Sequence, residues 1–178
     1  MTYTRDDIVA EARRWLGTPY HHQASLCRVG TDCLGLVRGV WRTLHGADAE
    51  AVPAYSRDWA EATGTESMLA AARRHLREID RTAATRGDVV IFRYRPRAIA
   101  KHVGILTAPD RMIHAIEGAA VGEVPLGPWW RRHMAAAFSF PGVQSGWPRS
   151  PLQLPAPRSG QRCCLPASPS SARPSRVP

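Results

Sequence analysis

The sequence contains no run of about 18 consecutive apolar residues, so it predicts no membrane span. The first residues also lack the basic-then-apolar pattern of a secretory leader. We therefore expect synthesis in the cytoplasm, and any action outside the cell would need another carrier. The 178 residues are enough for one domain with a substantial hydrophobic core.

Lysine is almost absent, since Lys101 is the only one and arginine supplies nearly all of the positive charge. The net charge of +9 overstates a basic surface, because residues 141–178 contain five arginines and no acidic residue. The only basic cluster before that segment is Arg93–Lys101, and no aromatic-bearing basic stripe or known nucleic-acid motif accompanies it. The sequence therefore predicts no nucleic-acid partner.

Cysteine is also scarce, and the four cysteines are Cys27, Cys33, Cys163 and Cys164. Their number and spacing do not predict a disulfide framework. The His21-His22 pair followed by Cys27 and Cys33 matches no closed structural zinc site, and no second pair of ligands follows at a suitable spacing. We expect neither a metal nor another cofactor.

Helical signals dominate the first half of the chain. A capping box at Thr4–Asp7 introduces an apolar stripe that ends at Gly17. A second helix runs from Cys33 to about His45, with Thr31 or Asp32 as its N-cap. After a turn-rich stretch in which Pro53, Tyr55 and Trp59 are the expected anchors, a third helix is predicted over about 65–78.

The second half of the chain is typical of strands. The predicted strands are Val89–Phe92, Lys101–Leu106, Arg111–Ile116, Val121–Leu126 and Ala135–Phe140, with a loop or single turn at Trp129–Arg132. The second and third form a hairpin, and Pro125 favours an edge position for the fourth. Helices followed by consecutive antiparallel strands indicate an α+β domain, with the N-terminal helices packed on one side of a central antiparallel β-sheet.

The composition changes after Gly142. We predict a domain over 1–142 and a Ser-, Pro- and Arg-rich tail over 143–178, which has too few apolar residues to offset the entropy of ordering and is expected to be disordered.

Cys33 lies in the first turn of the second predicted helix, where free N–H groups and the helix dipole favour a thiolate. Taken alone, this segment fits a buried structural cysteine better, because free cysteine is among the most buried residue types. Two downstream histidines change that interpretation. Strand alternation allows His102 and His114 to be neighbours across the predicted hairpin.

These residues fit the roles of nucleophilic acyl chemistry. Cys33 would attack, His102 would take and return the proton, and His114 would orient His102. The Cys33 backbone N–H and the Tyr20 hydroxyl are candidate donors to the oxyanion.

The chain resembles the NlpC/P60 cell-wall peptidases over about residues 5–141. The matching stretches are Gly17–Tyr20, Asp32–Val37, Gly87–Phe92, His102–Ile105 and Ile113–Ala115. More narrowly, the stretches His21–Ser25, Trp129–Arg132 and Phe138–Pro141 resemble short members encoded with phage tails and gene transfer agents.

The resemblance implies a papain-like cysteine peptidase fold and hydrolysis of peptidoglycan stem peptides, typically at the bond between γ-D-glutamyl and a diamino acid. It implies Cys33 as nucleophile, His102 as base and His114 as orienting residue. Tyr20 would lie near the oxyanion site, and Asp32 would help to hold the amino end of the substrate. Partner proteins would be those of a phage-like tail, which would carry the enzyme on the particle.

One position departs from the family, because Leu34 replaces the usual serine after the cysteine. Two alternatives to a peptidase stay open: a structural tail-tip or assembly component with little catalysis, and a Cys-His amidase or acyltransferase with another substrate. Retention of all three catalytic residue types favours the peptidase.

Overall fold

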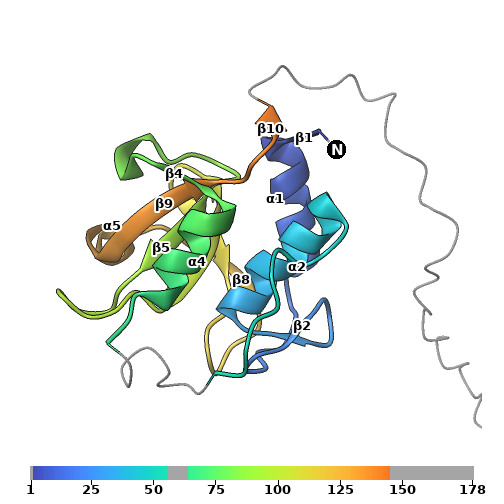
Figure 1. Ribbon diagram of the computed structural model, residues 1–178, viewed down its shortest axis with the longest axis horizontal. Coiled ribbons are helices and arrows are strands. Elements are labelled where there is room, and N and C mark those ends of the chain that lie inside the picture. Colours follow the sequence, from blue (N-terminus) through green and yellow to red (C-terminus); the bar gives the residue numbers. More distant parts are fainter. Residues whose placement is uncertain (1, 56–63, 145–178) are drawn as a thin grey trace, which may run out of the picture. The chain divides into compact units, whose positions relative to one another are not determined.

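The computed structural model describes residues 2–55 and 64–144 (Figure 1). Trp59, Cys163, Cys164 and residues 145–178 of the predicted tail lie outside the described residues. The helices are α1 (Arg5–Arg14), α2 (Cys33–His45), α4 (Ser67–His75), α5 (Pro128–His133) and the 3-10 helix η1 (Arg81–Ala83).

A six-stranded sheet with the order β4-β9-β5-β6-β7-β8 forms the centre of the domain, and all of its neighbouring strands are antiparallel. Its strands are β4 (Arg77–Ile79), β5 (Val89–Phe92), β6 (His102–Ala108), β7 (Arg111–His114), β8 (Gly122–Pro125) and β9 (Met134–Ser139). The predicted α+β class, the β6–β7 hairpin and the edge position of the Pro125 strand are confirmed.

The two faces of the sheet bury different partners. Side chains of α1, α2 and α4 pack against one face, where Val103, Ile105 and Phe138 lie in a continuous core (Figure 1). The other face holds a smaller apolar cluster that includes Phe92 and Met112, and Trp130 of α5 packs against it. Because alternate residues of β6 belong to opposite faces, His102 shares a face with Leu106 rather than with Val103.

Several elements differ from the sequence-based expectation. The edge strand β4 was not predicted, because its exposed Arg77 and Glu78 give no apolar alternation. The expected loop or turn near Trp129 is the short helix α5, with Pro128 in its first turn. Two small pairs, β2 (Ser25–Leu26) with β3 (Gly30–Thr31) and β1 (Tyr3–Thr4) with β10 (Val143–Gln144), were also missed.

The strand pair β1–β10 includes the first two residues of the predicted tail. We predicted that the tail begins at 143, but Val143 and Gln144 form parallel strand partners for Tyr3 and Thr4. The sequence does not reveal β10, because a two-residue strand is too short to show an alternation of apolar and polar residues.

The predicted starts of the first two helices are confirmed, whereas α1 ends at Arg14 rather than near Gly17 and α4 spans Ser67–His75 rather than about 65–78. Thr4 and Asp7 exchange side-chain and backbone hydrogen bonds in a capping box at α1. Asp32, rather than Thr31, caps α2, and Gly46 ends that helix with a φ of 89°.

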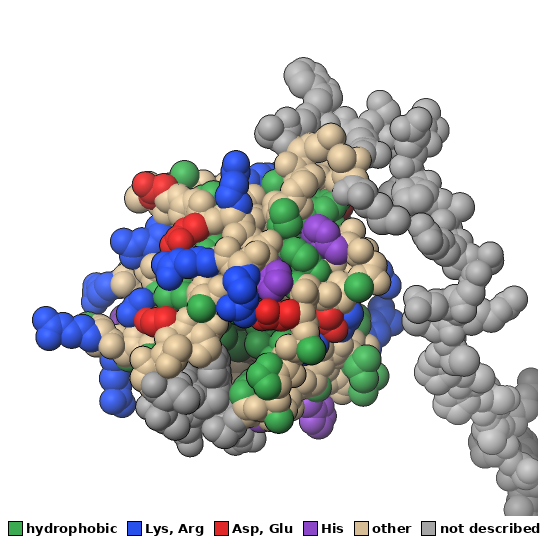
Figure 2. Space-filling model, in the orientation of Figure 1, with side chains coloured by type: hydrophobic (Ala, Val, Ile, Leu, Met, Phe, Trp, Pro, Cys, Tyr) green, Lys and Arg blue, Asp and Glu red, His purple; other side chains and the backbone are tan. Residues whose placement is uncertain are grey.

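Arginine side chains at the surface are largely paired with acidic ones. Asp48 pairs with Arg38 and Arg42, and Glu50 pairs with Arg74. Figure 2 shows basic side chains spread over one face with acidic ones between them. Among the described residues, no helix is both long and apolar enough to cross a bilayer.

Helices α1 and α2 approach closely at Gly39. A Cβ on Gly39 would lie 1.9 Å from Cζ2 and 2.2 Å from Cη2 of Trp15. The Trp15 ring is 3% exposed, and its Nε1 donates to Glu11 Oε1 at 3.3 Å. The absence of a side chain at Gly39 therefore lets the indole ring lie directly on the backbone of α2.

We predict that Gly39→Ala lowers the free energy of unfolding by about 1 to 3 kcal/mol, because overpacking exceeds the gain in helix propensity. Urea denaturation of the full chain measures this change. The control is Gly122→Ala, whose new Cβ would lie 3.8 Å from the nearest atom, the Ala120 carbonyl oxygen. A change above about 0.5 kcal/mol in the free energy of unfolding of Gly122→Ala would contradict the packing argument. So would an unchanged free energy of unfolding in Gly39→Ala.

Candidate active site

The Asp32 carboxylate organises the loop that precedes α2. Its Oδ1 accepts a hydrogen bond from the Gly35 N–H at 2.7 Å, which caps the helix. Its Oδ2 accepts from the Gln23 N–H at 2.8 Å and from the Tyr55 hydroxyl at 2.5 Å. His22 Nδ1 lies 3.8 Å from the same oxygen. Asp32 is 3% exposed, so one buried carboxylate ties three separate segments together.

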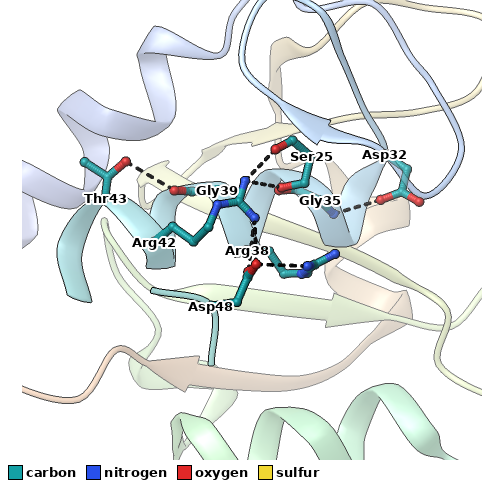
Figure 3. Close-up of polar contacts among 8 residues, drawn as sticks. All are labelled: Ser25, Asp32, Gly35, Arg38, Gly39, Arg42, Thr43 and Asp48. Carbon is teal, nitrogen blue, oxygen red and sulfur yellow. Dashed lines mark hydrogen bonds and ion pairs between the residues drawn. The ribbon is translucent and has the colours of Figure 1, made fainter. Parts of the chain in front are cut away.

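A second set of contacts fixes the same loop to the middle of α2. Arg42 of α2 lies between Ser25 and Asp48 in Figure 3. Its Nη2 donates to Ser25 Oγ at 2.7 Å, and its Nη1 lies 3.0 Å from Asp48 Oδ1. The Ser25 hydroxyl in turn donates to the Gly35 carbonyl oxygen at 2.5 Å. The loop is therefore held at both its β2 strand and its end at Asp32.

Cys33 is the first residue of α2 and lines a cleft of about 380 Å³. The lining includes Tyr20, His22, Asp32, Leu34, Tyr55, Tyr94, Lys101, His102 and Glu117. The backbone N–H groups of Val103, Leu34 and Cys33 are directed at the sulfur. The nucleophile expected from the sequence thus shares one cleft with the expected base.

The two histidines form a direct pair across β6 and β7. His102 Nε2 lies 2.8 Å from His114 Nδ1, and the rings meet edge to face at 5.1 Å between centroids. A Cβ on Gly104 would lie 3.4 Å from the His114 Cβ and 3.1 Å from the Ile113 carbonyl oxygen. Gly104 therefore leaves the space in which His114 can turn toward His102.

The protonation states differ from the sequence-based expectation. Burial raises the pKa of the Cys33 thiol to about 12, and the nearby Asp32 charge adds to the rise. The N–H groups at the helix start lower the pKa of Cys33, but by less. Burial lowers the pKa of His102 to about 3, with a smaller contribution from His114. Both shifts oppose a thiolate–imidazolium pair in the free protein, whereas the helix position of Cys33 alone favoured a thiolate.

Comparison with known proteins agrees with this arrangement. The model of the NlpC/P60 family matches residues 17–138, which cover the Asp32 loop, α2 and the histidine pair. The chain belongs to the NlpC/P60 family. No curated protein sequence matches the chain.

Solved structures share the NlpC/P60 fold at low sequence identity. An NlpC/P60 family protein from Bacillus cereus has a TM-score of 0.58 and 22% identity over 79% of this chain, which spans 41% of that protein. The NlpC/P60 domain of the peptidoglycan hydrolase SagA has a TM-score of 0.55 and 24% identity, over 78% of this chain and all of that domain. NlpC2 from Trichomonas vaginalis has a TM-score of 0.54 and 16% identity, over 79% and 48% of the two chains.

Tyr20 and Asp32, two further predicted site residues of this NlpC/P60 domain, also line the cleft. Tyr20 pairs through its backbone with Thr31 and lies in the cleft wall. Leu34 lines both this cleft and a second, more apolar cavity of about 260 Å³ between α2 and α4. The residue that replaces the family serine therefore joins the cleft to an apolar space.

Three aromatic residues of the site were not assigned to it from the sequence. Tyr55 bonds Asp32, Tyr94 lies in the cleft with its ring 5.9 Å from His102, and Trp130 stacks on His102. Each is far from Cys33 in the chain or on a loop without periodicity. Tyr55 was expected only as an anchor, and Trp130 entered only through the family resemblance.

The histidines and cysteines considered for zinc are not brought together. His21 is exposed, His22 contacts the Asp32 and Tyr55 segments, and Cys27 Sγ donates to the Arg14 carbonyl oxygen at 3.3 Å. Within residues 2–55 and 64–144, no three His, Cys, Asp or Glu side chains are grouped as metal ligands.

We predict that Asp32→Asn lowers the free energy of unfolding by about 2 kcal/mol. The amide oxygen can still cap Gly35, but an NH₂ group would face the two donors that now bond Oδ2. Urea denaturation at constant m-value measures the loss. The matched control is Asp48→Asn, a partly exposed partner of α2 whose loss should cost less than about 1 kcal/mol. Equal midpoints for wild type and Asp32→Asn would show that the carboxylate does not hold the loop.

Proposed function

We propose that this protein is a cysteine endopeptidase that hydrolyses peptidoglycan stem peptides. The observation that carries the proposal is the shared cleft, which is lined by Cys33 at the start of α2 and by His102, whose ring is hydrogen-bonded to His114. A thiol with a neighbouring imidazole, itself oriented by a third group, is the arrangement that nucleophilic acyl transfer requires.

The proton path follows from the histidine contact. Because Nε2 of His102 is bonded to His114, Nδ1 is the nitrogen left to accept the Cys33 proton. In that tautomer His102 Nε2–H donates to His114 Nδ1. As the sulfur attacks the carbonyl carbon, its proton moves to His102 Nδ1, and the S–C bond forms while the carbonyl π bond opens.

The negative oxygen of the tetrahedral intermediate needs nearby donors. The first N–H groups of a helix have no acceptor within the helix, and those of Cys33 and Leu34 are directed toward the sulfur. We assign the Cys33 N–H and the Tyr20 hydroxyl to the oxyanion. His102 then gives its proton to the leaving amine as the C–N bond breaks. In the second half of the reaction, water attacks the thioester, His102 takes a proton from the water, and that proton returns to the departing Cys33 sulfur.

The substrate assignment rests on chemistry and on family likeness. A structural neighbour is named a peptidoglycan hydrolase, and the residue pattern resembles peptidases of stem peptides. We assign cleavage to the bond between γ-D-glutamyl and a diamino acid. Asp32 contributes negative charge at the cleft wall, which would attract the amino end of such a peptide.

The test is digestion of purified peptidoglycan, with the released fragments and new amine ends identified by mass. We expect the wild type to cleave and Cys33→Ala to release nothing above background. Cys27→Ala is the matched control, because Cys27 is a second free cysteine that does not line the cleft. His102→Ala should lose about 10² to 10⁴-fold in rate, and His114→Ala should lose less, because orientation costs less to remove than proton transfer.

Each outcome separates the alternatives. No new amine ends from the wild type would favour a structural tail component or another acyl substrate. Cleavage that survives in Cys33→Ala would remove the proposed nucleophile. Equal losses in both histidine variants would contradict the division of roles between them.

We also propose that the enzyme is carried on a phage-like tail or gene transfer agent particle. Support comes from the resemblance of the stretches His21–Ser25, Trp129–Arg132 and Phe138–Pro141 to members of that type. Peptide mass spectrometry of purified particles from the source cells should then find the chain at a fixed ratio to tail proteins. Its recovery only in the particle-free fraction would overturn this proposal.

A further inference from the structure

Trp130 lies against both histidines of the site. Its ring stacks on His102 at 5.3 Å between centroids with an interplanar angle of 29°. It also meets His114 edge to face at 5.2 Å and 89°, and Phe92 at 4.8 Å and 64°. One indole therefore touches both members of the hydrogen-bonded pair and the core beside them.

We propose that Trp130 is a positioning residue, which fixes the His102 ring in its working orientation and keeps water from it. The expected loss of rate rests on the proposed function. The effect of Trp130 on the orientation and protonation of the histidine pair does not, and it can be measured without substrate turnover.

The helix that carries Trp130 is itself held in place. Arg131 Nη2 donates to the Pro109 carbonyl oxygen at 2.9 Å, and the Arg93 N–H donates to the His133 carbonyl oxygen at 3.0 Å. Leu126, just before α5, is 3% exposed. These contacts tie α5 to the β6–β7 turn and to the end of β5, so the indole has a fixed support.

The rings around His102 restrict its rotation. The His114 bond fixes one nitrogen, and the Trp130 face lies along the ring. Phe92 and Tyr94 also contact the ring, with centroids at 6.0 and 5.9 Å. Rotation of the imidazole out of its plane would bring it against the indole stacked on it. A small loss of alignment is costly in proton transfer, so this restraint should affect the rate.

Trp130 also affects the charge state of the pair. His114 on β7 is the direct partner of His102. The titratable groups that line the cleft with His102 are Tyr20, His22, Asp32, Cys33, Tyr55, Tyr94, Lys101 and Glu117. Burial is the largest cause of the low pKa of His102. Removing the indole would admit water, stabilise the imidazolium and raise that pKa.

The sign of the pH effect follows directly. His102 must be neutral to accept a proton, so activity falls as pH drops through its pKa. With a pKa near 3, the wild type should keep its activity well below pH 6.5, the ordinary value for histidine. In Trp130→Ala the acid limb of kcat/KM should move up by about one unit or more.

The experiment compares Trp130→Ala, Trp130→Phe and Trp129→Ala in the full chain. Peptidoglycan cleavage is followed against pH, and the His102 ring is titrated by NMR. We expect Trp130→Ala to lower kcat about tenfold with little change in KM, and Trp130→Phe to recover most of the loss. Trp129 is the control, because this adjacent indole stacks on His133 and meets Trp130 edge to face at 4.9 Å, whereas the ring stacked on His102 is that of Trp130. Trp129→Ala should change the rate by less than about twofold.

The readouts distinguish the two proposals. An upward shift of the His102 titration in Trp130→Ala alone supports the inference even if no chain cleaves peptidoglycan, an outcome that would remove only the proposed function. An unchanged His102 titration in a folded Trp130→Ala protein overturns the inference. So does an equal shift in Trp129→Ala. If Trp130→Ala does not fold, Trp130→Leu takes its place, and an unshifted His102 titration in folded Trp130→Leu would overturn the inference.

Discussion

The geometry of this site depends first on one buried carboxylate. Asp32 caps α2 through Gly35, and holds the preceding loop through Gln23 and the following segment through Tyr55. Without these bonds, the start of α2 would fray, and the first N–H groups would no longer be aimed at one point. The position of Cys33 at the start of α2 thus depends on hydrogen bonds made by its neighbour Asp32.

The second half of the site is built by strand pairing. Antiparallel register brings β6 and β7 together, Gly104 leaves room, and the two imidazoles meet at hydrogen-bond distance. Burial raises the pKa of Cys33 and lowers that of His102, since an ion pair would have to be formed in a poorly solvated place. Charge separation is therefore expected during attack on the substrate, where the oxyanion donors can balance it.

Local patterns predicted much of this arrangement. The capping signals at Thr4 and Asp32 and the strand alternation around His102 and His114 depend on neighbouring residues, so the sequence reveals them. The charge state of Cys33 does not follow from its place in a helix, because burial depends on segments far away in the chain. Trp130 could not be assigned for the same reason: its contacts with His102 exist only once α5 lies over the sheet.

The pairing of β1 with β10 brings the entry and exit of the domain to one place. Tyr3 lies opposite Val143, and the pair lies at the end of the domain away from β2 (Figure 1). Any polypeptide joined to either side would leave from a common point of attachment. The two ends of the described domain also hold each other in place, because loss of either short strand would leave backbone groups of the other unpaired.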